Sequence, residues 1–297
     1  MKKRENKIPG VIINLLFCLG SLMFILPFVL IIAASFTDEQ ALLAQGYKLI
    51  PAEFSTEAYK YVFRNPQQLI DSYKITIIYS IAATFLGVVV MSMLAYPLSK
   101  PNYKYKKILT FFIFFTMLFS GGLIPTYIWL TRYLHMGDTV WVYILPNLVN
   151  AFHVIVIRTF FQGLPQSLTE AAKIDGASEL KTFFTIVIPL SKPVIATISL
   201  LTLLARWNDW NTALIYINSP NLYSLQYLLQ KILREVEFVK NMAENTPIAG
   251  IDMDASTLPS ETIRFAMCMV AAGPMLVVFP FFQKYFAKGL TVGAVKG

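Results

Sequence analysis

Charged residues are scarce in this sequence. Asp, Glu, Lys and Arg make up 14% of its 297 residues, whereas soluble domains average roughly 25%. Hydrophobic residues reach 56%, and they are gathered in repeated stretches of about 20 residues, the length that crosses a bilayer as a helix. The composition therefore excludes an ordinary soluble domain and indicates a membrane protein that crosses the bilayer several times.

Cysteine and histidine are also rare, with two of each. Cys18 and Cys268 both fall inside apolar stretches, and neither has a partner at a spacing typical of metal ligands, so a disulfide framework and a metal site are excluded. His135 and His153 are too far apart to form a metal site together. We expect no metal, no cofactor and no catalytic residue in this chain.

The formal net charge is +8. A basic chain could bind nucleic acid, but the basic residues are scattered over short loops and form no patch interleaved with aromatic residues. The excess of Lys and Arg in cytoplasmic loops of membrane proteins explains the charge better. We therefore predict no nucleic-acid partner.

Runs of about 20 apolar residues predict an all-α membrane protein with six transmembrane helices. The predicted spans lie near 11–34, 73–97, 108–131, 140–161, 191–217 and 263–286. The first run is too long for the apolar part of a cleaved signal peptide, which has ~7–15 residues. No repeat or linker divides the chain, so we expect a single membrane domain over 1–297.

The distribution of charge predicts the orientation of these spans. With the N-terminus in the cytoplasm, the inner segments hold 15 basic and four acidic residues, whereas acidic residues outnumber basic ones in the outer loops 35–72, 132–139 and 218–264. This is the asymmetry of the positive-inside rule. Both termini and the segment 162–190 are then cytoplasmic, and the two larger outer loops contain helix-like pieces, "TEAYKYVF" and "LQYLLQKILREVEFVKNM".

The cytoplasmic segment contains "TEAAKIDGASELKTFFTIVIPL", 169–190. Ser167 and Glu170 have the spacing of a capping box, which predicts that a helix starts there with Glu170 near its positive end. Gly176 is suited to a left-handed helix end, and Ser178 is suited to begin a second helix. The pattern predicts a short surface helix, a glycine corner and an amphipathic helix that returns to the membrane. On the residues alone, an ordinary connecting helix–turn–helix is an equal alternative.

This segment resembles the EAA loop of the membrane subunits of bacterial ABC importers. The shared residues stand at the family spacing: Glu170, Ala171, Ala172, Asp175, Gly176, Ala177, Ile186, Pro189 and Pro193. The segment 124–146 and the glycine-rich end "KGLTVGAVKG" are similar to the maltose-permease-like branch for carbohydrates. "GGLIP" at 121–125 and the longer last outer loop are similar to the subgroup for complex oligosaccharides.

The resemblance implies a type I ABC importer fold and a set of partners. These are a second permease in a heterodimer, two ATPase subunits that bind ATP and Mg, and an extracytoplasmic solute-binding protein in the bacterial cytoplasmic membrane. Residues Glu170 to Ala172 and Asp175 to Ala177 would form the coupling helix that docks into the ATPase. A cytoplasmic tail, 287–297, would reach the ATPase through Gly289, Gly293, Lys296 and Gly297. In agreement, the sequence has no GxxxxGK[ST] phosphate loop.

Polar residues inside the fourth and fifth predicted spans are candidates for a sugar pathway. An Arg or Asp at the centre of a membrane helix costs about 2.5–3.5 kcal/mol, so Arg206 and Asp209 should avoid lipid. An equal alternative to a pathway is an Arg206–Asp209 pair flanked by interfacial tryptophans. Aromatic faces stack on sugar rings and amides bond hydroxyls; the candidates are Trp207, Asn208, Trp210 and Asn211, with a stripe of Asn147, Asn150 and His153.

Two other classes fit the sequence less well. A stand-alone secondary transporter would usually show an inverted repeat and several intramembrane carboxylates, but only Asp209 qualifies. A membrane enzyme would need a nucleophile and base or a metal site. A third alternative, an ABC importer permease for a solute other than a sugar, is left open by the residues.

Overall fold

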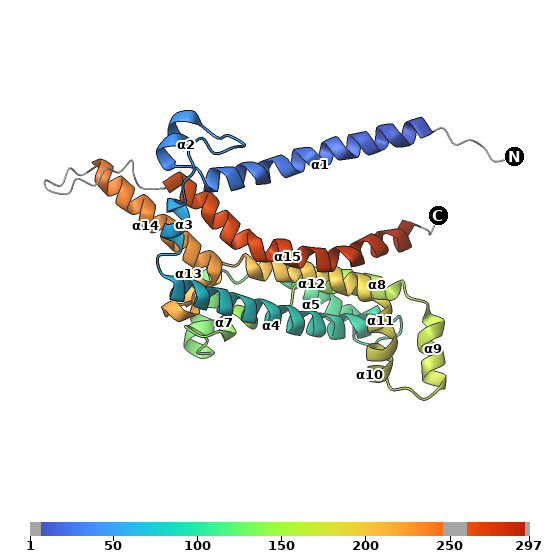
Figure 1. Cartoon of the computed structure of the whole chain (residues 1–297). Coiled ribbons are helices and arrows are strands. Elements are labelled where there is room, and N and C mark those ends of the chain that lie inside the picture. Colours follow the sequence, from blue (N-terminus) through green and yellow to red (C-terminus); the bar gives the residue numbers. More distant parts are fainter. Residues whose placement is uncertain (1–6, 246–259, 295–297) are drawn as a thin grey trace. The chain divides into compact units, whose positions relative to one another are not determined.

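The computed structural model describes residues 7–245 and 260–294, and their regular elements are helices (Figure 1). Apart from helices, these residues contain one isolated β-bridge, between Thr37 and Phe54. The chain divides into two compact units, the first made of 1–66 and 229–274 and the second of 67–228 and 275–297. The predicted all-α class is confirmed.

Unit 1 contains helices that the sequence places in its two larger outer loops. Its elements are α1 (Lys7–Ser35), α2 (Glu39–Gln45), α3 (Glu57–Val62), most of α14 (Leu225–Asn245) and the first part of α15 (Ser260–Ala294). The helix-like pieces predicted in these loops therefore do form helices, as α3 and α14. Helix α14 has one apolar face and one polar face, as expected for a surface helix.

A buried carboxylate joins α2 to the start of α15. Glu39 is 5% exposed, and its oxygens accept hydrogen bonds from the backbone N–H groups of Glu261 (2.8 Å) and Thr262 (2.9 Å). The Thr262 hydroxyl donates a further bond at 2.7 Å. The first N–H groups of a helix have no partner within the helix, and its N-terminus attracts negative charge. Glu39 thus caps α15 from a segment more than 200 residues away in sequence.

We predict that Glu39→Gln destabilises unit 1, because the amide loses the negative charge and one of the acceptor oxygens while the N–H groups stay buried. A bond to a charged group contributes about 1.5–3 kcal/mol. The thermal unfolding midpoint of the purified protein in detergent should therefore fall. Glu57→Gln is the matched control, since that side chain is 64% exposed and pairs only with Lys60 in the described structure. Equal midpoints for the two variants would contradict the prediction.

Unit 2 contains the remaining helices. They are α4 (Pro66–Ser99), α5 (Lys106–Leu118), α6 (Leu123–Ile128), the π-helix η1 (Trp129–Tyr133), α7 (Trp141–Ile144), α8 (Ala151–Gln162), α9 (Gln166–Ile174), α10 (Glu179–Thr182), the π-helix η2 (Phe183–Val187), α11 (Ile188–Leu190), α12 (Lys192–Trp207), α13 (Asn211–Tyr216) and the short 3₁₀-helix η3 (Pro220–Leu222). The start of α14 and the end of α15 also belong to this unit.

Three helices in the described ranges are long and apolar enough to cross a membrane, and five spans result if each bent helix pair counts as one. The three are Ile13–Ser35, Pro66–Ser99 and Ser260–Gln283, at the first, second and sixth predicted spans. The third corresponds to the bent pair Lys106–Leu118 with Leu123–Tyr133 (111°). The fifth, 191–217, overlaps only the second helix of the pair Glu179–Leu190 with Lys192–Trp207 (82°), and it is broken between Trp207 and Asn211.

The fourth predicted span, 140–161, is not one helix. Four residues form α7, and α8 begins only at Ala151. Pro146 lies in the break, where its missing N–H and its ring prevent a regular helix from continuing. Asn150 then caps α8, because its side-chain oxygen accepts the N–H of His153 at 3.1 Å. The apolar run predicted the location of the segment but not the break within it.

The core of unit 2 forms where α4 passes α8, η2 and α12. Buried residues from these elements make one cluster: Val88, Met91, Ala95, Tyr96, Leu98, Val154, Ile157, Phe161, Phe183, Val187, Val194 and Ile198. A second cluster surrounds Tyr79 and Tyr143, whose rings stack with centroids 4.3 Å apart. Along α4, small residues let other segments approach closely: a Cβ on Gly87 would lie 2.7 Å from the backbone oxygen of Leu148.

We predict that Gly87→Ala destabilises unit 2, because the added methyl group forces α4 away from the backbone at Leu148. Overpacking of this kind costs about 1–3 kcal/mol. The control is Gly20→Ala in α1, where nothing lies within 4 Å of the added Cβ. The thermal unfolding midpoint in detergent should fall for Gly87→Ala and stay close to wild type for Gly20→Ala; no difference between them would show that the approach is not tight.

Candidate functional site

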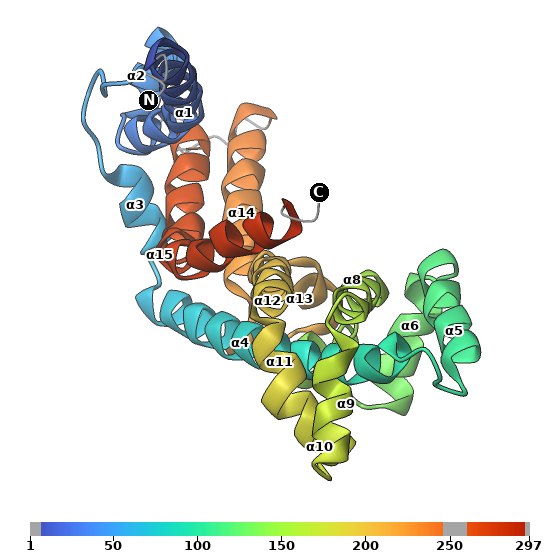
Figure 2. The ribbon, with the colours of Figure 1, turned by 90° about the vertical axis from the view of Figure 1, so that its right-hand side faces the viewer.

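The predicted surface helix, glycine corner and returning helix are all present. They are α9, the turn 175–178, and α10 with η2 and α11, and Figures 1 and 2 show α9 and α10 side by side at one edge of the ribbon. We call the segment 166–190 the corner segment. Pro189 does not end the last helix at once, since α11 continues to Leu190, but the chain then bends by 82° into α12.

Gly176 forms the turn in the way the sequence predicts. Its φ is +73°, a left-handed conformation that glycine adopts without strain. The N–H of Gly176 donates to the oxygen of Lys173 (3.0 Å) and that of Ala177 to the oxygen of Ala172 (2.9 Å), the two bonds of a Schellman motif. Ser178 then caps α10 by accepting the N–H of Lys181 at 3.3 Å. Both predictions for the corner are confirmed.

The predicted capping box at Ser167 is wrong. The first helix begins earlier, at Gln166 after Pro165, and no side chain caps its N-terminus. Proline has a backbone angle suited to a helix start and leads directly into the first turn. Ser167 therefore lies inside α9, and Glu170 lies in the middle of the helix rather than near its positive end.

The coupling candidates differ in how they face solvent. Glu170, Ala171, Asp175 and Gly176 are exposed, Ala177 is half-buried, and Ala172 is 8% exposed. Ala172 therefore packs against its own chain, and of the two alanines only Ala171 presents its side chain to solvent.

Large apolar side chains on the corner segment were not among the candidates. Ile174 is 87% exposed and Leu180 is 61% exposed, and Leu168 and Phe184 are also exposed. Ile174 and Leu180 lie on either side of the glycine turn. Because the same stretch carries charged residues, these two side chains are not expected to face lipid. Exposed apolar residues on such a segment are candidates for contact with another protein. The sequence pattern that could have identified them is the isolated isoleucine directly before "DG".

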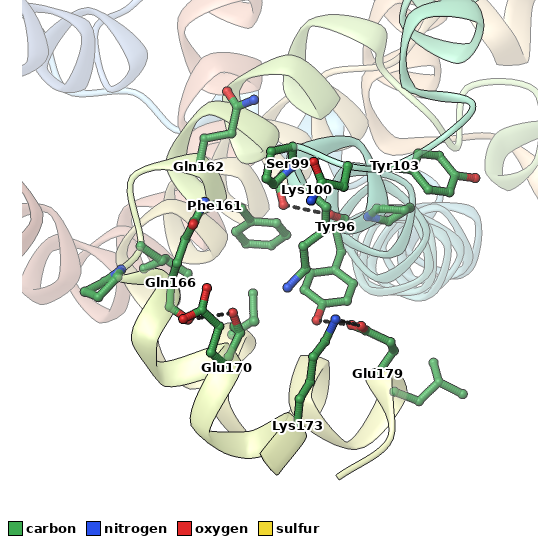
Figure 3. Close-up of a pocket in the computed structure, with 18 of the residues that line it drawn as sticks. Tyr96, Ser99, Lys100, Tyr103, Phe161, Gln162, Gln166, Glu170, Lys173 and Glu179 are labelled. Carbon is green, nitrogen blue, oxygen red and sulfur yellow. Dashed lines mark hydrogen bonds and ion pairs between the residues drawn. The ribbon is translucent and has the colours of Figure 1, made fainter. Parts of the chain in front are cut away.

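A polar cluster joins the corner segment to α4, and Figure 3 shows its side chains. The Glu179 carboxylate forms an ion pair with Lys173 of α9 (2.7 Å) and accepts a hydrogen bond from the Tyr96 hydroxyl of α4 (2.7 Å). The hydrogen bond and charge of Glu179 raise the pKa of Lys173. These three residues line a cavity of about 630 Å³ that also has Lys100, Phe161 and Glu170 in its wall. The sequence alone does not identify Tyr96 and Glu179 as site residues, since no spacing rule brings α4 and α10 together.

The predicted cytoplasmic tail starts as a helix. Because α15 runs without interruption to Ala294, the part of 287–297 that is described is helical, and Gly289 and Gly293 lie within α15. Lys296 and Gly297 lie outside the described residues.

The substrate-pathway candidates do not form the faces that an unbroken helix would give. Helix α12 ends at Trp207, and α13 starts at Asn211, so Asn208, Asp209 and Trp210 form the link between them. Trp207 is 4% exposed, which leaves its ring unavailable for stacking on a sugar. Asn208 donates to the oxygen of Leu204 (2.9 Å) and accepts from Gln226 (3.3 Å).

The alternative of an Arg206–Asp209 pair is also wrong for this conformation. Arg206 donates to the backbone oxygen of Asn147 (2.7 Å), whereas Asp209 accepts from the N–H and hydroxyl of Thr212. The predicted stripe is interrupted as well: Asn147 lies in a turn, Asn150 caps α8, and His153 contacts Thr202 at 3.5 Å. The structure thus brings Asn147 and His153 to α12 but does not place all three candidates of the stripe on one helix.

Comparison with known proteins decides the family. The family model for the "Binding-protein-dependent transport system inner membrane component" matches residues 83–292. The chain belongs to this family of ABC importer permeases. It is therefore a multi-pass inner-membrane permease subunit rather than an enzyme or a stand-alone secondary transporter.

Similar proteins align with this permease over almost its whole length. Protein LplC of Bacillus subtilis is 42% identical over 96% of this chain and 94% of its own length. The polygalacturonan/rhamnogalacturonan transport system permease protein YtcP of the same organism is 38% identical over 99% and 100%. A chain of a crystallised bacterial ABC transporter involved in the import of the acidic polysaccharide alginate is 28% identical, with a TM-score of 0.75, over 96% of this chain and 99% of that one.

We predict that Gly176→Ala destabilises the corner of the permease, because a Cβ in the left-handed region costs about 1–2 kcal/mol. Space is not the reason, since nothing lies within 4 Å of the added atom. Gly163→Ala is the matched control, in a nearby turn with φ of −80°. Hydrogen exchange of the corner amides should rise several-fold in Gly176→Ala and stay unchanged in the control. Equal exchange would show that the turn tolerates alanine.

Proposed function

We propose that this permease forms half of the membrane channel of an ATP-driven importer for a carbohydrate, an oligosaccharide or a fragment of a polysaccharide. The names of the similar transporters, which handle polygalacturonan, rhamnogalacturonan and alginate, support this substrate class. Alternating access would carry the solute across the membrane, coupled to ATP hydrolysis in a separate subunit. A permease for a non-sugar solute is the second candidate.

The permease would work within a larger complex and with a defined topology. A second permease would complete a heterodimer, two ATPase subunits would bind ATP and Mg, and a solute-binding protein would deliver substrate from outside. Six spans with both termini in the cytoplasm fit the charge distribution of the sequence. In that arrangement the broken segment α7–α8 would serve as the fourth span, with protein neighbours bonding the interrupted backbone.

The corner segment would bind the ATPase and so couple it to the permease. Its exposed Ile174 and Leu180 would enter the ATPase surface, Ala171 would allow close approach, and Glu170 would make a charged contact. Asp175, Gly176 and Ala177 would shape the turn. Gly289, Gly293, Lys296 and Gly297 would extend towards the ATPase, the first two on the helical end of α15.

A polar pathway for the sugar would use the predicted residues that are exposed or half-buried, without Trp207. The exposed candidates are Asn147, Asn150, Asn208, Trp210 and Asn211, with His153 half-buried beside Thr202. Their amides are suited to bond sugar hydroxyls once the channel opens. Trp207 would act as a packing residue at the end of α12 and not as a stacking surface.

Pull-down from native membranes tests the coupling surface. Wild-type permease should co-purify with an ATPase subunit. With Glu170→Lys or Gly176→Trp, the amount of co-purified ATPase should fall at least tenfold, because a reversed charge and a bulky side chain block docking. Glu57→Lys is the matched control, with the same charge change at an exposed position in α3. If no ATPase accompanies the wild type in mild detergent, the coupling proposal fails.

Uptake of labelled fragments of polygalacturonan, rhamnogalacturonan and alginate, beside a neutral oligosaccharide, tests the substrate class. Cells that lack the permease should lose uptake of at least one of them and regain it on complementation. Unchanged uptake of every saccharide would favour the non-sugar solute.

A further inference from the structure

The Glu179 carboxylate contacts two helices other than its own. One oxygen pairs with Lys173 across the glycine turn, and the other accepts the Tyr96 hydroxyl from the last turn of α4. Figure 3 shows the three side chains meeting at the wall of the cavity. Among the described residues, this hydrogen bond is the one polar side-chain link from α9 or α10 to α4.

The ring of Tyr96 is held independently of its hydroxyl. Its side chain belongs to the buried cluster of unit 2, with the Phe183 ring centroid 5.2 Å away and the Lys100 ammonium 4.6 Å above its face. Removing the hydroxyl would leave these contacts in place and create no cavity. The hydroxyl can therefore act on the position of Glu179 without being needed for packing.

The ion pair adds a side-chain contact across the glycine turn, which the two Schellman bonds already hold together. Lys173 is in α9 and Glu179 is in α10, so their contact closes the turn around Gly176. A displacement of the exposed tip at Ile174 then reaches Glu179, and its hydrogen bond to Tyr96 passes the displacement to the end of a 34-residue helix. Charge-assisted bonds are shorter and about twice as strong as neutral ones, which suits a contact that must transmit force.

We infer that Tyr96, through Glu179 and Lys173, is a positioning residue that couples movement of the corner segment to α4. The inference rests on the proposed function, because it takes the ATPase as the source of the movement. Its consequence is specific: loss of the Tyr96 hydroxyl should leave the ATPase bound and hydrolysing ATP, while less of the hydrolysis produces transport.

The test uses the whole complex, with both permeases, the ATPase subunits and the binding protein, reconstituted in liposomes. Tyr96→Phe should lower uptake of a labelled polygalacturonan fragment per ATP hydrolysed by about tenfold, the effect of one lost bond to a charged group. ATPase co-purification should be unchanged, and rates are expressed per assembled complex. Tyr105→Phe is the matched control, since that exposed tyrosine has no hydroxyl hydrogen bond in the described structure.

A second variant separates the two contacts of Glu179. Lys173→Met removes the ion pair but keeps the Tyr96–Glu179 hydrogen bond, so its uptake per ATP should fall less than that of Tyr96→Phe. Uptake per ATP at the wild-type level in Tyr96→Phe overturns the inference, and so does a loss that occurs only together with loss of bound ATPase. If the wild-type complex couples no saccharide uptake to ATP hydrolysis, the proposed function itself fails.

Discussion

Backbone N–H and C=O groups must be hydrogen-bonded inside a membrane, and the structure depends on this constraint throughout. A continuous helix meets it alone, as in α1 and α4. At the breaks near 145–150 and 208–210, side chains of unit 2 bond backbone carbonyl oxygens. Tyr79 donates to the oxygen of Arg206 (3.0 Å), and Arg206 in turn donates to that of Asn147 (2.7 Å). Ser224 donates to the oxygen of Asp209 (2.9 Å).

These bonds explain why Tyr79, Tyr143 and Arg206 stand in apolar segments. Tyr79 and Tyr143 stack as a pair deep in the unit, and each uses its hydroxyl on a carbonyl oxygen, Tyr143 on that of Leu222 at 2.8 Å. A tyrosine is suited to this because its ring packs like an apolar side chain while its hydroxyl bonds. The breaks are thereby stabilised as defined bends.

The corner segment meets a different requirement, because it must leave the apolar core and still be rigidly connected to it. Buried Ala172 and Phe183 anchor its two halves, and the Schellman turn between them needs only backbone bonds. Polar contacts to α4 then add direction to the apolar anchoring. Exposed apolar side chains on a rigid support suit the coupling role that is proposed for this segment.

The sequence by itself determined what depends on neighbouring residues along the chain. Apolar runs predicted the membrane class and the sites of the helices, Gly176 and Ser178 predicted the corner, and the motif around Glu170 identified the family that comparison confirmed. Tertiary structure decided the rest. The break at Pro146, the separate partners of Arg206 and Asp209, and the Tyr96–Glu179 bond depend on packing between segments distant in sequence. A periodic pattern assumes an unbroken helix, and it holds no information on which distant side chain will bond a released carbonyl.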